Sequence, residues 1–214
     1  AAQGITVLTL DSAVDSDIPL CFVATNNVEA GEKAGSVMAD RLEPDKAVAI
    51  VGHVKGAATA IDRELGVRGG LAGRTVAGTY FCENFSDRAY LITKEIMEAY
   101  PDLGGIVALN EVSTMGVARA IRDLNLKGRV KVVGFDHSIA EIKLIEDGII
   151  DATVVQKPFN MGYLAVKKTY EALQGRRPER FIDTGSVLIT VENIYTPENQ
   201  KLLFPFPEKQ RRIY

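Results

Sequence analysis

The 214-residue sequence is poor in the residues from which most catalytic and metal sites are built. It has two cysteines and two histidines, and these form neither a Cys-x-x-Cys nor a His-x-x-x-His pattern, so no metal site is predicted. No Gly-x-Ser-x-Gly elbow accompanies His53 or His137, and His137 stands where it could cap a helix, so we expect no catalytic residue. Cys21 and Cys82 lie in apolar runs, which predicts buried thiols.

The sequence also lacks the features of membrane-spanning and nucleic-acid-binding chains. No apolar run approaches the roughly 20 residues needed to cross a bilayer, and the formal net charge is only -3. So balanced a charge predicts no nucleic-acid partner. The one basic cluster, at Lys209, Arg211 and Arg212, is typical of a solvated tail. The chain opens with Ala1 rather than Met, and we expect a processed or partial chain.

Phosphate-binding loops are absent as well. No Walker-type Gly-x-x-x-x-Gly-Lys-Ser/Thr pattern occurs, and the glycines from Gly66 to Gly73 end a helical segment, whereas a dinucleotide fingerprint opens a helix. A glycosidase could use two carboxylates such as Asp11 and Asp136, but the amides that follow the neighbouring strands favour binding over proton transfer. The sequence therefore predicts no cofactor, and an enzyme acting on a sugar is the least favoured hypothesis.

Apolar, β-branched runs alternate with segments of helical period. The runs are Ile5–Leu10, Leu20–Thr25, Ala47–Val51, Val76–Phe81, Gly105–Leu109, Val130–Phe135, Ala152–Val155 and, late in the chain, Ser186–Val191. The helical segments are Glu29–Leu42, Ala57–Leu71, Asp87–Ala99, Ser113–Leu124, Ile139–Asp147 and Met161–Leu173. The runs lack two-residue alternation, which is typical of parallel strands buried on both faces. The sequence predicts an α/β fold with mainly parallel sheets. The first two runs are separated by too short a link for a helix and need not be neighbours.

Nearly every run is followed by an amide or a carboxylate. The residues are Asp11, Asn26, Asn27, His53, Glu83, Asn84, Asn110, Asp136 and Gln156. Ligands of open parallel sheets bind outside the carboxyl ends of the strands, and carboxylates and amides can bracket neighbouring hydroxyl groups of a sugar. Asp and Asn are equally favoured as helix N-caps, so at any single position capping explains the residue as well as binding does.

The order and sequence of these stretches resemble a known family. Ile-Thr-Val-Leu-Thr-Leu-Asp-Ser at residues 5–12, Val-Ala-Thr-Asn-Asn at 23–27 and Val-Val-Gly-Phe-Asp at 132–136 resemble the type I periplasmic binding proteins. These share their fold with the effector domains of lactose-repressor-type regulators. The similarity also covers 29–35, 56–66, 108–111, 147–158, 161–165 and 183–185, and it is strongest to ribose-binding proteins.

The resemblance implies two flavodoxin-like lobes joined by three crossing strands. Residues 1–27 and 158–184 would then be a remnant of the N-terminal lobe, and residues 28–157 and 185–197 the C-terminal lobe. Residues 198–214 would be a tail. The family's first strands are not in this chain, so we expect an incomplete N-terminal lobe that pairs with a missing N-terminal segment or self-associates.

Six residues match the family's sugar-binding positions. The resemblance implies that the polar ones hydrogen-bond the sugar and that the aromatic one covers a sugar face: Asp11, Arg63, Phe85, Asn110, Asp136 and Gln156. Tyr80 and Asn84 neighbour the aromatic position. Ser12 departs from the arginine that ribose-type proteins often have there, which puts ribose itself in doubt. Arg63 has a plain alternative as a solvated arginine between two acidic residues.

By this resemblance the chain is a non-catalytic binding protein for a monosaccharide, a ribose-like pentose or related polyol, that closes around its ligand by a hinge motion. Its partners would be the membrane permease of an ABC importer or a membrane sensor, and it would lie in the periplasm or on the outer cell surface. The alternative is the effector core of a transcription regulator, which would be cytoplasmic.

Overall fold

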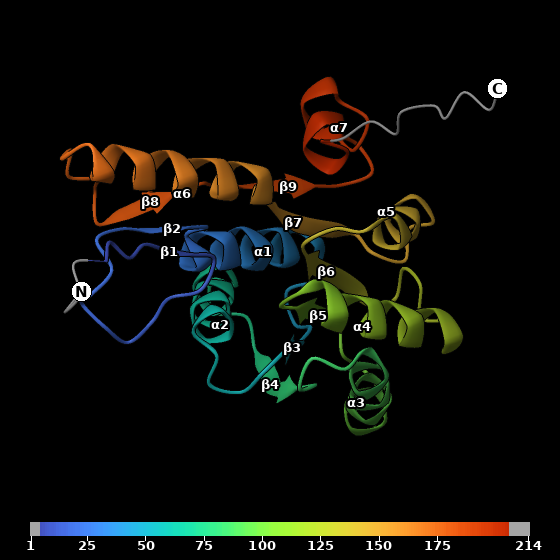
Figure 1. Ribbon diagram of the computed structural model, residues 1–214. Coiled ribbons are helices and arrows are strands. Elements are labelled where there is room, and N and C mark those ends of the chain that lie inside the picture. Colours follow the sequence, from blue (N-terminus) through green and yellow to red (C-terminus); the bar gives the residue numbers. More distant parts are fainter. Residues whose placement is uncertain (1–4, 206–214) are drawn as a thin grey trace.

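The computed structural model describes residues 5–205, which build two sheets of unequal size (Figure 1). The large sheet has the strand order β4-β3-β5-β6-β7-β9 and the small sheet β1-β2-β8. The strands are β1 (Thr9–Leu10), β2 (Phe22–Ala24), β3 (Val48–Gly52), β4 (Val76–Phe81), β5 (Gly105–Ala108), β6 (Lys131–Phe135), β7 (Ala152–Gln156), β8 (Phe181–Asp183) and β9 (Ser186–Ile189). The helices are α1 (Asn27–Arg41), α2 (Ala58–Gly70), α3 (Ser86–Ala99), α4 (Glu111–Asp123), α5 (Ile139–Glu146), α6 (Pro158–Leu173) and α7 (Pro197–Leu203). All pairs are parallel except β7 with β9. The basic cluster at 209–212 lies outside the described residues.

Helices cover both faces of the large sheet, which explains its continuous apolar runs. Within β3, Val48 and Ile50 pack with α1 and α2, while Ala49 and Val51 pack with α3, α4 and α5 on the opposite face. Successive side chains of a strand point to opposite faces, so a strand covered on both sides is apolar at every position. The predicted α/β fold with parallel-dominated sheets is confirmed.

Four glycines bring α1 and α2 into backbone contact. A Cβ added at Gly31 would lie 2.3 Å from the Arg63 carbonyl oxygen, and one added at Gly66 would lie 2.0 Å from the Val28 oxygen. Gly35 and Gly70 make the same approach one turn further along. Any side chain at these four positions would push the two helices apart. The glycines from Gly66 onward, which match no phosphate loop, thus serve helix packing.

The small sheet packs against α6 through a separate apolar cluster of Cys21, Val23, Met161 and Ala165. β1 and β2 are parallel neighbours, although the link between them contains no helix. The sequence left this pairing open. In the structure, an irregular loop makes the crossover connection from β1 to β2. Both cysteines are free and buried. No helix among the described residues has the length and apolar character to cross a bilayer.

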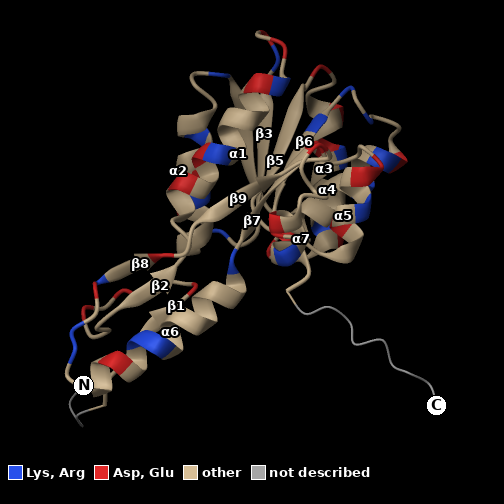
Figure 2. Cartoon of the chain, turned by 90° about the horizontal axis from the view of Figure 1, so that it is seen from above, with Lys and Arg blue, Asp and Glu red and all other residues tan. Residues whose placement is uncertain are grey.

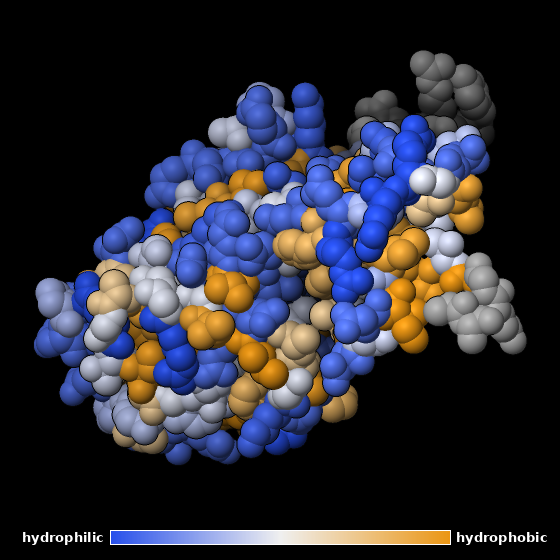
Figure 3. Space-filling view, turned by 90° about the vertical axis from the view of Figure 1, so that its left-hand side faces the viewer, coloured by the Kyte–Doolittle hydropathy of each residue, from blue (hydrophilic) through white to orange (hydrophobic). Residues whose placement is uncertain are grey.

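The exposed face of α6 is apolar. Tyr163, Val166, Tyr170 and Leu173, spaced by three or four residues, are all more than half exposed, at 59%, 72%, 62% and 67%. Figure 3 looks onto the end of the molecule where the small sheet lies and shows apolar surface between hydrophilic side chains. Charges of both signs are interspersed over the described helices and loops (Figure 2).

The chain passes between the sheets at three places: β2 to α1, β7 to α6 and β8 to β9. The first and third passages are tied together, because one carboxylate oxygen of Asp183 accepts hydrogen bonds from the backbone N–H groups of Asn26 at 2.9 Å and Gly185 at 2.8 Å. Lys33 donates to the backbone and hydroxyl oxygens of Ser186 at 3.2 Å. The first and third passages therefore form one hydrogen-bonded region.

Part of the segment expected to be a tail is helical. Thr196 caps α7 through its hydroxyl, which accepts from the Asn199 N–H at 3.4 Å. Pro197 occupies the first turn, a position that suits its fixed φ. Leu203 at the helix end is only 4% exposed and joins the large core. Residues 198–203 thus belong to the packed structure.

Candidate functional site

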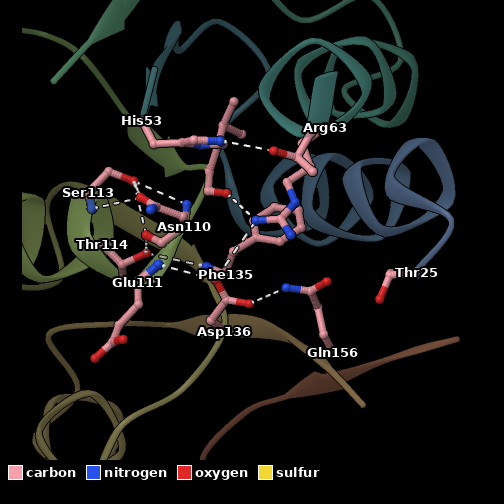
Figure 4. Close-up of polar contacts among 12 residues, drawn as sticks. Thr25, His53, Arg63, Asn110, Glu111, Ser113, Thr114, Phe135, Asp136 and Gln156 are labelled. Atoms are coloured by element: carbon pink, nitrogen blue, oxygen red, sulfur yellow. Dashed lines mark hydrogen bonds and ion pairs between the residues drawn. The ribbon is translucent and has the colours of Figure 1, made fainter. Parts of the chain in front are cut away.

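The carboxylate of Asp136, directly after β6, is the centre of a polar cluster (Figure 4). One of its oxygens accepts from Nε2 of Gln156 at 2.6 Å, and the other lies 3.8 Å from Nη1 of Arg63 and 3.4 Å from the backbone N of Glu111. Asp136 has a φ of 69°, a left-handed conformation that Asp tolerates better than most residues. The Thr153 hydroxyl donates to its carbonyl oxygen at 2.9 Å. Three elements therefore fix this carboxylate.

Arg63 reaches the cluster from α2 and is only 4% exposed. Its Nε donates to Oδ1 of Asn27 at 2.8 Å and its Nη1 to the carbonyl oxygen of Leu109 at 2.7 Å. Its guanidinium carbon lies 4.7 Å from the centre of the Phe135 ring, an arrangement that favours a cation. Nη2 forms no hydrogen bond within residues 5–205. The alternative of a solvated surface arginine is wrong, because the helix packing described above carries Arg63 over the strand ends.

Two pKa shifts follow from this burial. Burial lowers the pKa of Arg63, and the carboxylates of Asp136 and Asp11 oppose that shift. Arginine nevertheless stays protonated in proteins. Burial lowers the pKa of His53 too, with the Arg63 charge acting in the same direction. The ring of His53 contacts the Thr59 hydroxyl at 3.0 Å, so His53 is a neutral hydrogen-bonding group beside the cluster.

Asn110, after β5, lies between two residues that contact the cluster, Leu109 and Glu111, and caps its own helix. Its side-chain oxygen accepts from the Ser113 N–H at 3.0 Å, and the Ser113 hydroxyl completes a capping box. Its amide nitrogen donates to Oδ1 of Asn84 at 2.9 Å. The capping explanation therefore applies at this position, and the amide nitrogen points toward the next strand end.

Asp11 lies at the far side of a small cavity. This cavity, of about 200 Å³, is lined by Asp11 and Asn27 together with Thr59 and Asp62 of α2, so it lies between the end of the small sheet and that of the large one. Asp11 has a φ of 67° and is exposed. Its charge acts on Arg63, which places it at the edge of the same site.

Phe85 forms no hydrogen bond or ring contact with the other predicted residues in the described part of the chain. It stands at the N-cap of α3 and is 67% exposed. Its neighbours Glu83 and Asn84 both have positive φ, 50° and 60°, and Asn84 reaches Asn110. An exposed ring beside a polar pair can cover an apolar sugar face only if a ligand lies over Asn84.

Sequence reasoning missed the anchors of Arg63. Asn27 was assigned to a chain crossing, and the Leu109 carbonyl and Phe135 ring carry no sequence signal for this role. No group of three His, Cys, Asp or Glu residues within 5–205 could hold a metal ion. His137 was expected as a helix cap, but Ser138 caps α5 and His137 contacts the Leu203 carbonyl oxygen at 3.1 Å.

A larger cavity of about 380 Å³ lies beside the second passage, between the start of α6 and α7. Its lining is mostly apolar and includes Pro158, Phe159, Val187 and Leu202. None of the six predicted residues contributes to it. Hydroxyl recognition needs converging polar groups, so the candidate site is the cluster around Asp136 rather than the larger cavity.

Several known proteins are similar to this chain. A family model described as a periplasmic binding protein domain matches residues 1–177. The ribose import binding protein of Bacillus subtilis (strain 168) is 27% identical over 191 residues, which make up 88% of this chain and 62% of that protein. A D-ribose/D-allose-binding protein of Pseudomonas aeruginosa is 26% identical over 202 residues, or 91% and 63%. The chain thus spans about three fifths of these relatives' length.

Solved structures show the same similarity. An ABC transporter solute binding protein from Agrobacterium vitis, bound with alpha-D-tagatopyranose, superposes with a TM-score of 0.90 at 28% identity, covering 94% of this chain and 72% of that one. A carbohydrate transporter solute binding protein from Agrobacterium radiobacter, in complex with D-arabinose, gives a TM-score of 0.86 at 26% identity, with 94% and 72% covered.

Proposed function

The chain belongs to the type I periplasmic binding protein family, and on that premise we propose that it binds a monosaccharide reversibly and without chemical change. The observation that carries the proposal is the convergence of Arg63 and Gln156 on the Asp136 carboxylate, with Asn110 at the end of the neighbouring strand β5. Related proteins that bind ribose, allose, arabinose or tagatose by their names support a pentose or a related hexose as the ligand.

Each group in the cluster has a complementary partner on a sugar. The Asp136 carboxylate would accept from two adjacent hydroxyl groups, and Nη2 of Arg63 would donate to one of their oxygens. Gln156 and Asn110 can both donate and accept. Because Arg63 is already held by Asn27 and Leu109, little side-chain entropy remains to be lost when the sugar binds.

Closure would occur at the three passages. Asp11 belongs to the small sheet and Arg63 to the large one, with a cavity between them. A ligand that contacts both favours the closed state by its extra contacts there. The hydrogen bonds of Asp183 and Lys33 described above would keep the first and third passages aligned during that motion.

The proposed setting is sugar uptake. Solute-binding proteins of ABC transporters among the relatives support an extracytoplasmic location and a membrane permease as the partner. No observation favours the transcription-regulator alternative.

Isothermal titration of the full-length protein against ribose, arabinose, xylose, allose, tagatose, galactose and inositol tests the proposal. We expect saturable binding of at least one sugar, with a negative heat-capacity change. The absence of binding to all seven would refute the proposal.

A matched pair of variants tests the site. Arg63→Lys keeps the charge but loses the planar fork, and losing one charge-assisted hydrogen bond of about 1.5–3 kcal/mol should weaken binding roughly ten- to a hundredfold. Arg68→Lys, on the same helix but exposed and paired with Glu64 at 2.8 Å, should bind like the wild type. Equal affinities of the two variants would place the sugar elsewhere.

A further inference from the structure

Behind the candidate site lies a buried carboxyl group that the proposed function does not use. Glu141, in the first turn of α5, is fully buried, with 0% exposure. Neither of its carboxyl oxygens has a hydrogen-bond donor among the described residues. A buried carboxylate without donors costs several kcal/mol, so a neutral acid is the form that this position accommodates.

The groups around Glu141 favour the neutral form as well. A Cβ built on Gly134 would meet Oγ1 of Thr114 at 2.8 Å and Oε1 of Glu141 at 3.1 Å, so these two side chains share the space over Gly134. The Thr153 hydroxyl lies beside the same carboxyl. Both hydroxyl protons are already committed, since Thr114 donates to the Asn110 carbonyl oxygen at 2.7 Å and Thr153 to that of Asp136 at 2.9 Å. Toward Glu141, each threonine hydroxyl can therefore only accept a hydrogen bond.

Nearby negative charges also favour the neutral form of Glu141. The charged groups that act on Glu141 are Asp136, after β6, and Glu111, at the start of α4, and both are acidic. Burial, with these two like charges, raises the pKa of Glu141 well above its usual value, and the nearby Thr153 hydroxyl opposes this only in part. The carboxyl group therefore holds its proton when exposed carboxylates have lost theirs.

We propose that Glu141 is a positioning residue for sugar binding: the single proton of its neutral carboxyl group is donated to the hydroxyl of Thr114 or Thr153, the two residues whose hydroxyls hold the backbones of Asn110 and Asp136. The inference rests on the proposed function. Ionisation of Glu141 removes the donor and places a negative charge behind Asp136, so the strand ends lose their alignment and sugar affinity falls.

The sign of the pH effect follows from the raised pKa. Unfolded Glu141 ionises near the ordinary glutamate pKa of 4.5, whereas the folded state keeps the proton to a higher pH. The folded state therefore binds one more proton between these two values, and stability falls as pH rises through that window. Above the folded-state pKa, sugar affinity falls by up to tenfold per pH unit, because only the protonated state binds well.

Glu141→Gln tests the proposal, because a neutral amide keeps a donor and cannot ionise. Sugar dissociation constants and melting temperatures are measured from pH 5 to 9 for the wild type, for Glu141→Gln, and for Glu146→Gln as a control at the exposed end of α5. We expect the wild type and Glu146→Gln to lose stability and affinity as pH rises, and Glu141→Gln to lose neither. A protonated carboxyl band should appear in the wild-type infrared spectrum at neutral pH and be absent from Glu141→Gln.

The outcomes are distinguishable. If the affinity of Glu141→Gln follows the same pH profile as the wild type, Glu141 is merely structural and the inference is wrong, while the proposed function stands. A wild-type protein that binds no sugar at any pH refutes the proposed function and this inference with it. If Glu141→Gln fails to fold, the absence of the carboxyl band from the wild-type spectrum at neutral pH overturns the inference.

Discussion

Gly66 lets α1 and α2 approach more closely than any residue with a side chain would permit, and we predict that Gly66→Ala destabilises the protein. A Cβ there would lie 2.0 Å from the Val28 carbonyl oxygen and 2.8 Å from the Glu32 backbone N. Both are helix backbone atoms that cannot rotate away. The helices must therefore separate, and Arg63, one turn before Gly66 on α2, must move with them.

Two opposing effects set the loss of stability expected for Gly66→Ala. Alanine is favoured over glycine within a helix by about 0.5–1 kcal/mol. Overpacking costs about 1–3 kcal/mol, and the upper end applies here because the obstacle is backbone. The expected net loss is about 2 kcal/mol, which lowers the melting temperature by roughly 4–8 °C for a protein of this size.

Gly69→Ala is the matched control, since Gly69 lies on the exposed side of the same helix. A Cβ there would approach only the Glu32 side chain, at 3.9 Å. This variant should gain about 0.5–1 kcal/mol and melt roughly 1–4 °C higher. Differential scanning calorimetry of both variants measures the difference. If Gly66→Ala melts at or above Gly69→Ala, the backbone contact between α1 and α2 does not exist as described.

Two further outcomes are expected. Asn110→Ser should keep the melting temperature near that of the wild type, because serine caps a helix as well as asparagine does. Titration should nevertheless show that this variant binds the sugar about tenfold more weakly. Asn110→Ala should show the same weaker binding and also lose about 1 kcal/mol of stability. Exposed apolar stripes promote association, so the wild type should elute as oligomers in size-exclusion chromatography with light scattering. The double variant Val166→Lys, Tyr170→Lys should shift this distribution toward monomer. A monomeric wild type would count against the apolar face of α6 as a contact surface.

The sequence predicted the large sheet well because both of its faces are buried. Runs such as Val132–Phe135 need no tertiary information, since every residue meets a hydrophobic neighbour on one face or the other. β8 was missed because Phe181–Asp183 has only three residues and two of them are exposed. α7 was missed although Thr196 and Pro197 form a recognisable helix start.

The site was predictable only in part. Residues at strand ends are brought together by the parallel sheet itself, so Asp136 and Gln156 were expected to lie near each other, and they are in contact. Arg63 comes from a helix, and its depth depends on glycine contacts between α1 and α2 that no single-sequence pattern reveals. Glu141 reads as an ordinary solvated residue of a short helix. Its burial depends on how α5 packs against β6 and β7, which sequence periodicity does not report.

Arg63 links the passages between the sheets to the candidate site. Its Nε is held by Asn27, the first residue of α1 after the chain leaves the small sheet, while Nη1 is held by the carbonyl oxygen of Leu109, at the end of β5. A rotation of the small sheet that pulls on Asn27 therefore acts on the same guanidinium group that faces Asp136. The hydrogen bond to Leu109 and the contact with the Phe135 ring hold Arg63 against the large sheet. The small sheet can therefore rotate without breaking the bond between Arg63 and Asn27 only if Asn27 keeps its position. The pivot of any closing motion should thus lie on the small-sheet side of Asn27, between Ala24 and Asn26.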